Sequence, residues 1–244
     1  MKASSPCRVA RGAILALGTV AALAHAQAPT CPAVHEWPAK MRIEYDVTAS
    51  RGPFSINGES VLLFERTGTA YAISIQTDSA AIYHARQSSR GSIEQDGLRP
   101  AEYVETRGKK TPQTTTFDWN ANNVSFSGHP DWSVPTQPGL QDRVSLVLQL
   151  AWRQRAETGT AAYEFPVVGA RRIGPYRFAR QGVETVRVPI GAVEAVRVER
   201  AADEEQDRIE AWLGTAWCGL PVRIRYTDRN GGVIDHRMRA ARID

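Results

Sequence analysis

Apolar and polar residues alternate along most of the chain from residue 41 onward. Residues 41–47 read Met-Arg-Ile-Glu-Tyr-Asp-Val, and residues 71–75 and 222–226 repeat the same pattern. Successive side chains of a strand point to opposite faces of a sheet, so a period of two predicts strands with one buried face. Such segments recur up to the C-terminus, and we therefore expect a mainly β protein.

One segment departs from this alternation. Five apolar residues recur there at the spacing of one helix face, namely Leu140, Val144, Val147, Leu148 and Ala151. The spacing predicts a single α-helix near residues 141–156. Sheets of about a dozen strands curl or split rather than stay flat. We expect one large antiparallel sheet, curled into a half-open or closed barrel around this central helix, with a two-sheet sandwich as the alternative.

Two short Asn-Gly sequences between apolar runs predict tight hairpin turns. They are Asn57-Gly58, ahead of Val61, and Asn230-Gly231 near the C-terminus. Asn and Gly adopt the positive φ values that two-residue hairpin loops need. A third connection, the proline-rich segment 129–139, is expected to form a loop that carries Trp132.

The first 26 residues have the three parts of a secretory signal. Basic residues come first, an apolar run follows over residues 13–23, and Ala24-His25-Ala26 supplies the small residues that a signal peptidase needs. The apolar run is shorter than the roughly 20 residues of a transmembrane helix. We expect cleavage after Ala26 and a single β-rich domain at residues 27–244, released into the periplasm without a transmembrane anchor.

Charge gives little support to a nucleic-acid partner. The chain carries a net charge of +4, with 30 Lys and Arg against 26 Asp and Glu. Three of these cations, Lys2, Arg8 and Arg11, leave with the predicted signal. The remaining domain is close to neutral, whereas nucleic-acid-binding domains are usually strongly basic. No nucleic-acid partner is expected.

Two cysteines remain after the predicted cleavage, Cys31 near the start of the domain and Cys218 near its end. In an oxidising compartment two cysteines form a natural pair, so a Cys31–Cys218 disulfide is the favoured interpretation, with two free thiols as the alternative. No further ligand type is clustered near either residue, and we expect neither a metal nor a cofactor.

Several short phrases resemble a family of exported bacterial proteins known as domain of unknown function 3108. The phrases are Gly97-Leu98-Arg99-Pro100, Phe117-Asp118-Trp119, Leu140-Gln141-Asp142-Arg143-Val144-Ser145, Tyr176-Arg177-Phe178, Gly182-Val183-Glu184, Pro189-Ile190-Gly191, Trp212-Leu213 and Leu220-Pro221-Val222-Arg223-Ile224. Their order and spacing cover about residues 40–240. The family is similar in outline to the unclosed barrels of periplasmic lipoprotein carriers, which implies a fold and assigns no activity. Cys218 does not belong to the family pattern.

No sequence motif of a known catalytic or metal site is present. The chain lacks HExxH, GxSxG, a phosphate loop, GxGxxG and CxxC. Three acids are the polar candidates. Asp118, Asp142 and Glu184 would form an acid–base site if the fold brought them together. The alternative interpretation makes Asp142 a charge at the helix start and Asp118 a hydrogen-bonding residue at a strand end.

Aromatic residues are the candidates for ligand binding. Phe117, Trp119, Trp132 and Trp152 lie on predicted strands, on the predicted helix or in the proline-rich loop. A curved sheet with an incompletely filled apolar interior can hold a lipophilic ligand. The alternative is that these rings fill the core around the helix. On the first interpretation the protein is a non-enzymatic binder or carrier of an apolar small molecule or acyl chain.

Arg223 and Arg225 alternate with apolar residues and predict a basic stripe on one face of a late strand. Such a stripe can contact an acidic partner, and it can equally be an ordinary solvated face. It motivates the second functional hypothesis, a cell-envelope accessory protein that acts through surface contacts with a protein, an anionic glycan or a lipid. An acid–base enzyme is the third hypothesis.

Overall fold

Fourteen antiparallel strands build one sheet in the computed structural model, which describes residues 28–79, 83–169, 173–201 and 207–244. The predicted secretory signal lies outside the described residues. The strands are β1 (Lys40–Arg51), β2 (Phe54–Thr67), β3 (Ala70–Ser79), β4 (Tyr83–Glu94), β5 (Gly97–Arg107), β6 (Gln113–Asp118), β7 (Asn123–Phe126), β8 (His129–Val134), β9 (Ala162–Val168), β10 (Ile173–Val188), β11 (Gly191–Arg200), β12 (Arg208–Gly214), β13 (Pro221–Thr227) and β14 (Val233–Ile243).

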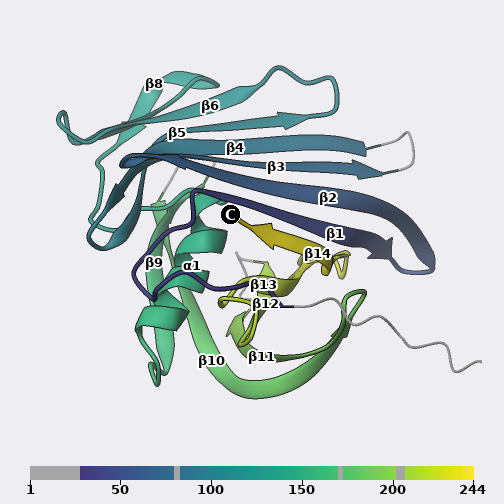
Figure 1. Ribbon diagram of the computed structural model, residues 1–244. Coiled ribbons are helices and arrows are strands. Elements are labelled where there is room, and N and C mark those ends of the chain that lie inside the picture. The colour runs from purple at the N-terminus through teal and green to yellow at the C-terminus, as the bar shows by residue number, and fades with distance from the viewer. Residues whose placement is uncertain (1–27, 80–82, 170–172, 202–206) are drawn as a thin grey trace, which may run out of the picture.

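The sheet has two arms that meet where β1 pairs with β14. The strand order runs from β8 down to β1, then to β14 and down to β9. Apart from the β1–β14 pair, all neighbouring strands are consecutive in sequence. Strands β8 and β9 end the sheet and do not pair with each other. Figure 1 shows the two arms curling toward each other. The half-open barrel expected from the sequence is therefore confirmed, and the two-sheet sandwich is not formed.

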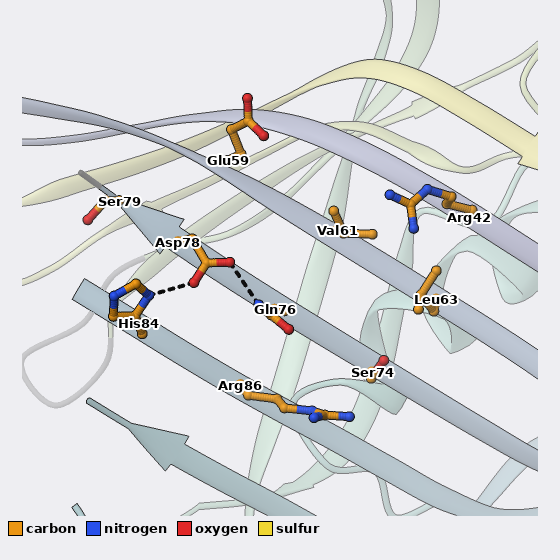
Figure 2. Close-up of a pocket in the computed structure, with 10 residues that line it drawn as sticks. All are labelled: Arg42, Glu59, Val61, Leu63, Ser74, Gln76, Asp78, Ser79, His84 and Arg86. Carbon is orange, nitrogen blue, oxygen red and sulfur yellow. Dashed lines mark hydrogen bonds and ion pairs between the residues drawn. The ribbon is translucent and has the colours of Figure 1, made fainter. Parts of the chain in front are cut away.

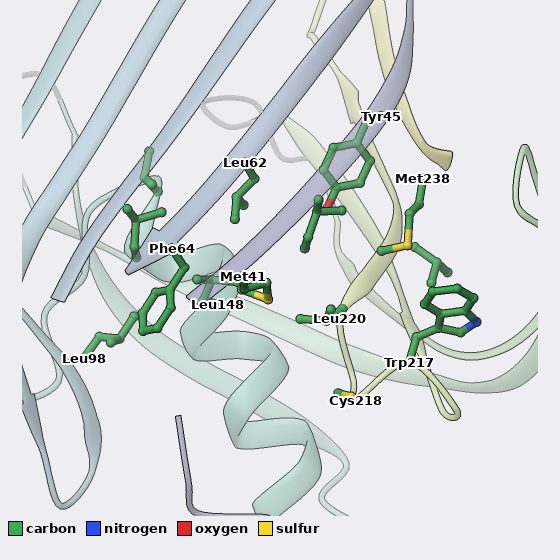
Figure 3. Close-up of a cluster of buried hydrophobic side chains, with 14 of the residues drawn as sticks. Met41, Tyr45, Leu62, Phe64, Leu98, Leu148, Trp217, Cys218, Leu220 and Met238 are labelled. Carbon is green, nitrogen blue, oxygen red and sulfur yellow. The ribbon is translucent and has the colours of Figure 1, made fainter. Parts of the chain in front are cut away.

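Apolar and polar residues that alternate in the sequence are alternately buried and exposed in the sheet. In β1, Ile43 and Tyr45 are buried on the concave face while Arg42 is exposed on the convex face. Register carries this pattern across the sheet, since Ile43 pairs with the fully buried Leu62 of β2. Figure 3 shows buried apolar side chains of this concave face gathered around the helix. Burial of each such side chain stabilises the fold by about 1.5–3 kcal/mol.

Helix α1 (Ser145–Ala156) lies between the two arms and has apolar contacts on both sides (Figure 1). Leu146 and Leu150 pack in a cluster with residues of β9 to β12. Leu148 packs in a second cluster with residues of β1 to β7, β10 to β14 and their connections. The helix is thus the central plug that the sequence predicted. No helix in the described ranges is both long and apolar enough to cross a membrane.

The helix begins at Ser145, four residues after the start of the predicted range near 141–156. The side chain of Asp142 accepts hydrogen bonds from the backbone N–H groups of Val144 and Ser145, and this turn precedes the first helical residue. Gln141 instead forms a bridge to Val167 of β9. Leu140 and Val144 precede the helix but are buried in the same core as its apolar residues. The helical spacing in the sequence therefore extends beyond the helix itself, which is why the predicted range began too early.

One predicted turn is correct and another is wrong. The Asn230-Gly231 turn connects β13 to β14, with Gly231 at φ 78°. Asn57-Gly58 instead lies inside β2, and the β1–β2 turn is formed at Gly52, whose φ is 57°. Gly58 is required by a close approach, since a Cβ built there would lie 2.4 Å from the carbonyl oxygen of Asp78. Part of the expected loop 129–139 is also regular, because residues 129–134 form β8.

The N-terminal segment is fastened across helix α1 (Figure 1). Cys31 and Cys218 form the predicted disulfide, with their Cα atoms 5.3 Å apart. Arg155 of the helix donates a 2.7 Å hydrogen bond to the carbonyl oxygen of Pro32. Trp37 stacks on Trp152 of the helix at a centroid distance of 6.2 Å. The disulfide therefore anchors a strap that covers the helix.

Candidate functional site

Asp142 is fully buried at the start of helix α1. Its carboxylate accepts hydrogen bonds of 2.8 Å from the backbone N–H groups of Val144 and Ser145. Ser89 of β4 donates a further hydrogen bond of 2.5 Å and shares a 3.0 Å hydrogen bond with the hydroxyl of Tyr71. Burial raises the pKa of Asp142 to about 6, although these hydrogen bonds oppose the rise.

Two glutamines extend this connection to strand β5. Gln141 donates a 2.8 Å hydrogen bond to the carbonyl oxygen of Leu98, and Gln149 accepts one of 2.8 Å from the N–H of Leu98. Gln141 also exchanges backbone hydrogen bonds with β9 at Pro166 and Val168. Gly97 is needed here because a Cβ at this position would lie 2.2 Å from the side-chain oxygen of Gln149. Residues 141–149 therefore join one arm of the sheet to the other.

This cluster is a structural latch, which we define as Gln141, Asp142 and Gln149 with their partners on β4, β5 and β9. A fully buried carboxylate whose oxygens are already hydrogen-bonded to its own chain offers no open position to a substrate. The phrase Leu-Gln-Asp-Arg-Val-Ser that supported the family resemblance thus supplies most of the latch. The latch is a buried hydrogen-bond network that fixes the position of the helix.

The other two acidic candidates lie on different parts of the sheet. Asp118, at the end of β6, is exposed and accepts hydrogen bonds from the N–H groups of Asn120 and Ala121. Glu184 of β10 accepts a 2.6 Å hydrogen bond from the indole of Trp212. Among the described residues, no hydrogen bond or shared partner links Asp118, Asp142 or Glu184. The acid–base site therefore stays a prediction for which the geometry provides no common substrate position.

The four aromatic candidates fall in three places. Phe117 is buried and stacks on Trp119 at 6.4 Å, and the Trp119 indole donates to the carbonyl oxygen of Pro100. Trp152 lies on the helix beneath Trp37. Trp132 is half exposed on strand β8. Phe117, Trp119 and Trp152 thus contribute to packing, and the four rings do not surround one ligand position.

The two arginines of the predicted basic stripe lie half-buried on strand β13. Arg223 donates two hydrogen bonds of 2.8 Å to the carboxylate of Asp235 and lies over the ring of Trp212 at 4.7 Å. The paired carboxylate neutralises most of the attraction that Arg223 would offer to an anionic partner. Arg225 has a buried Nε with no hydrogen-bond partner in the described part of the chain.

The concave face changes in character between the helix and the far end of the sheet. Near the helix, Phe64 and Ile73 are buried. At the β1–β2 turn and the adjoining part of β14, Phe54, Ile56 and Ile234 are exposed by 77%, 41% and 41%. Scattered exposed apolar residues are ordinary, whereas neighbouring ones indicate a contact surface.

Strand register shows that these exposed residues share one face. Ile56 pairs with Ala49, and Ala49 pairs with Ile234 across the β1–β14 junction. Ala49 is two residues from the inward-facing Val47, and Phe54 is two residues from Ile56, so all point to the concave side. We call Phe54, Ile56 and Ile234 the apolar rim.

Polar groups lie between the apolar rim and the core. Tyr226 of β13 pairs with Ile234 of the rim, and His236 is the next inward-facing residue of β14. The His236 ring meets the rings of Tyr226 and Tyr45 edge-on at 6.3 Å and 6.0 Å. Burial lowers the pKa of His236 to about 4, so this ring is neutral at pH 7.

Arg143 supplies the cation of this region. Its positive charge acts to lower the pKa of Tyr103 on β5 and of Tyr226 on β13, although burial outweighs it and raises both. The guanidinium therefore lies within electrostatic reach of two hydroxyls on opposite arms. Two polar atoms, the Tyr103 hydroxyl on β5 and Nδ1 of His236 on β14, are buried with no hydrogen-bond partner in the described residues.

Sequence reasoning did not select Tyr103, Arg143, Tyr226 or His236. They come from three strands and one turn, and of these four residues Tyr226 and His236 are in ring contact. The one available signal was position, because Arg143 follows Asp142 in the phrase that supported the family resemblance.

Two surface hollows lie elsewhere. The first, of about 460 Å³, is on the convex face of β1 to β4, and Figure 2 shows that polar side chains line it together with Val61 and Leu63. His84 and Asp78 form an exposed pair of 2.6 Å in it, and Gln76 donates to the same carboxylate. The second, of about 430 Å³, lies beside His35 and Trp37 of the strap. No group of three or more His, Cys, Asp or Glu within the described ranges could hold a metal ion.

Comparison with known proteins identifies relatives by sequence and by fold. The family described as "Protein of unknown function (DUF3108)" matches residues 44–238. This match confirms the resemblance inferred from the short phrases. The search of curated proteins returned no match.

Among solved structures, a β-barrel-like protein of domain of unknown function DUF1849 from Brucella abortus is similar in fold. It has a TM-score of 0.56 at 14% identity, over 86% of this chain and 99% of that chain. A DUF1329 family protein from Desulfovibrio piger gives a TM-score of 0.31 at 11% identity, over 86% and 87%. A putative outer membrane lipoprotein-sorting protein domain from Vibrio parahaemolyticus gives 0.31 at 9% identity, over 87% and 88%. Only the first similarity is strong enough to describe the fold.

Proposed function

The chain belongs to the DUF3108 family of proteins of unknown function, and we propose that it is a non-enzymatic binder of a lipophilic ligand. The ligand lies on the concave face at the open end of the half-barrel. The observation that carries this proposal is the apolar rim, in which Phe54, Ile56 and Ile234 are exposed on one face of three consecutive strands, with Ala49 between Ile56 and Ile234.

The rim has the composition of a lipid-binding surface. Covering apolar surface contributes about 25 cal/mol per Å² removed from water, and an acyl chain supplies matching surface without hydrogen-bonding demands. The helix end of the same face is filled by two packed clusters of side chains. The ligand therefore rests on the open half of the concave face instead of in an enclosed space behind the helix.

The proposal places this binder in the periplasm, after cleavage of the signal over residues 1–26 and release of a domain at residues 27–244. The disulfide between Cys31 and Cys218 supports an oxidising compartment, because such bonds are rare where thiols are kept reduced. A carrier of apolar molecules has an evident task there, since acyl chains cannot cross an aqueous space unaided.

The first experiment is native mass spectrometry of the mature protein purified from periplasm, followed by organic extraction. We expect a bound acyl species at a fixed stoichiometry. A second measurement is titration with the neutral fluorescent probe N-phenyl-1-naphthylamine. The double variant Ile56→Ser with Ile234→Ser should bind the probe at least about tenfold more weakly than wild type, because it loses two of the three apolar side chains of the rim.

Leu63→Ser is the matched control for that variant. Leu63 is an exposed apolar residue of the same strand β2, 39% exposed, but it faces the convex side. It should leave probe affinity unchanged. Equal loss in the two variants, or no binding by wild type, would contradict the proposal.

The alternative, an accessory protein that acts through surface contacts, is favoured by one observation. Trp132 is 50% exposed on β8, which ends the sheet. An exposed edge strand can pair with a strand of another protein. A photo-crosslinking amino acid at position 132 should then capture a partner in the periplasm, whereas the same amino acid at position 54 should not.

A further inference from the structure

We infer that the hollow on the convex face of β1 to β4 binds a small dipolar ligand, with its anionic group at Arg42 and Arg86 and its cationic group at Asp78. The chemical class is that of a short peptide with free ends, three or four residues long. The hollow lies on the face opposite the apolar rim, so this inference stands independently of the proposed lipophilic ligand.

The residues that carry this inference line one hollow. Its volume of about 460 Å³ is within the range of roughly 300–1,000 Å³ that is usual for small-molecule sites. Strand register brings the lining together, since Leu63 of β2 pairs with Ser74 of β3, and Asp78 of β3 pairs with His84 of β4. Alternate residues of a strand point to the same side, so Ser74 and Asp78 both face the hollow. They lie about 13 Å apart along the strand.

One end of the hollow holds an unpaired cation. Arg86 of β4 is exposed, and it forms neither a hydrogen bond nor an ion pair with any described residue. Its partners in register on the adjacent strands are Gln76 and Thr106, which carry no charge. Figure 2 shows the Arg86 side chain extending away from His84 and toward Ser74. A guanidinium whose donors are free can bind a carboxylate through two parallel hydrogen bonds.

Arg42 of β1 adds a second cation to the same end. Its Nε donates a 2.8 Å hydrogen bond to Glu44, while its two terminal nitrogens have no hydrogen-bond partner in the described ranges. Arg42 pairs in register with Leu63, and Figure 2 shows Leu63 and Ser74 between the Arg42 and Arg86 side chains. An anionic group placed over Leu63 and Ser74 therefore has guanidinium donors on both sides.

The other end of the hollow holds an acid. Asp78 accepts a 2.6 Å hydrogen bond from His84 and one of 2.9 Å from Gln76 (Figure 2). These bonds occupy one lone pair on each oxygen, and the charged carboxylate retains room for an ammonium group. Glu59 also lines this end, but Arg239 binds both of its oxygens. Asp78 is therefore the acid that a cationic group of the ligand would meet.

The two ends carry opposite charges that do not pair with each other. No ion pair joins Arg86 to Asp78 in the structure as described. A ligand with one sign of charge would be attracted to one end and repelled by the other, whereas a dipolar ligand is attracted to both. An extended peptide spans about 3.3–3.6 Å per residue, so three or four residues place their charged ends about 10–13 Å apart. Val61 and Leu63 offer apolar surface to its side chains.

The test is an NMR titration of the oxidised, full mature protein with four probes: trialanine, its C-terminal amide, its N-acetyl form and free alanine. Trialanine should shift the backbone amide signals of Ser74, Gln76 and Arg86. It should bind at least about fivefold more tightly than either blocked form, because each block removes one exposed ion pair. Free alanine should bind as weakly as the blocked peptides, because its two charges are too close together to reach both ends.

Arg86→Gln should remove most of the preference for a free carboxylate and leave the preference for a free ammonium group unchanged. Asp78→Asn should have the reverse effect. Arg90→Gln is the matched control, since Arg90 is exposed on the same face of β4 but its guanidinium is bound to Glu102. It should change neither preference.

Three results would overturn the inference: no binding of trialanine, equal binding of trialanine and either blocked form by wild type, or signal shifts confined to residues outside the hollow. None of these results concerns the apolar rim, so the proposed function would remain to be judged by its own probe.

Discussion

The carboxylate of Asp142 accepts a 2.5 Å hydrogen bond from the hydroxyl of Ser89 and thereby ties the start of helix α1 to strand β4. Together with Gln141 and Gln149 it holds the two arms of an unclosed sheet around the helix. A sheet that does not close needs such a fastening, because in the described part of the chain its arms share strand pairing only at the β1–β14 junction.

Replacing Asp142 by Asn should change how stability depends on pH. Burial raises the pKa of the folded carboxyl to about 6, from 3.8. The folded state then holds its proton more tightly, so this group favours folding at low pH and loses that contribution as pH rises through 6. Urea unfolding of wild type and Asp142→Asn from pH 4 to pH 7 should show wild type losing roughly 2 kcal/mol relative to the variant.

Asp131→Asn, at an exposed carboxylate of β8, is the control for that series and should follow wild type throughout. A constant difference between wild type and Asp142→Asn across the pH range would show that the carboxyl is not perturbed in the folded protein.

The titration of His236 should change stability with pH in the direction opposite to that of Asp142, over nearly the same pH range. Its folded pKa is lowered to about 4 from 6.5, mainly by burial. The unfolded chain therefore takes up the proton first, and stability is lost as pH falls from about 6.5 to about 4. His236→Phe keeps the ring packed between Tyr45 and Tyr226, and it should remove roughly 2–3 kcal/mol of this acid sensitivity in urea unfolding. Wild type and variant curves of identical shape would contradict the assignment.

Gln149→Ala should destabilise the latch. The substitution removes the acceptor for the buried N–H of Leu98 and the donor to the carbonyl oxygen of Asp96. An unpaired buried N–H costs about 1–3 kcal/mol, which thermal unfolding will detect as a lower Tm. Gln154→Ala, in the same helix but without a hydrogen bond from its side chain in the described structure, should change stability by less than about 0.5 kcal/mol. Equal effects of the two substitutions would show that the latch contributes nothing specific.

Removal of the disulfide should weaken the strap over helix α1. The double variant Cys31→Ser with Cys218→Ser should lose about 2–4 kcal/mol in unfolding free energy, the usual contribution of such a bond. Adding a reductant should lower the urea midpoint of wild type to that of the variant and leave the variant itself unaffected. A wild-type midpoint that does not respond to reductant would mean that the bond does not constrain the unfolded chain.

The fold could be predicted because one physical rule governs most of it. Most strands bury one face against the helix or their neighbours, so alternation such as Ile43, Glu44 and Tyr45 appears directly in the sequence. The amino-acid composition of short segments was a less reliable guide to the positions of turns. Asn57-Gly58 has the composition of a turn, but Gly58 is needed inside β2 because β3 passes too close for a side chain.

The candidate site could not be predicted for a different reason. Tyr103, Arg143 and His236 are far apart in sequence, and nothing local distinguishes them from surface residues. What distinguishes them is a buried polar atom without a partner in Tyr103 and His236, and an exposed side chain next to the buried Asp142 in Arg143, and these are properties of the folded chain. The large aromatics attracted the first prediction because size is visible in sequence, whereas exposure is not.

We propose that a lipophilic ligand lies on the concave face at the apolar rim. Photo-labelling with an alkyl diazirine, followed by peptide mapping, locates the bound chain without any substitution in the protein. We expect labels at Phe54, Ile56 and Ile234 that an excess of unlabelled dodecanoate removes. Labels at Leu63 on the convex face or at Trp132 on β8, with none at the rim, would contradict it.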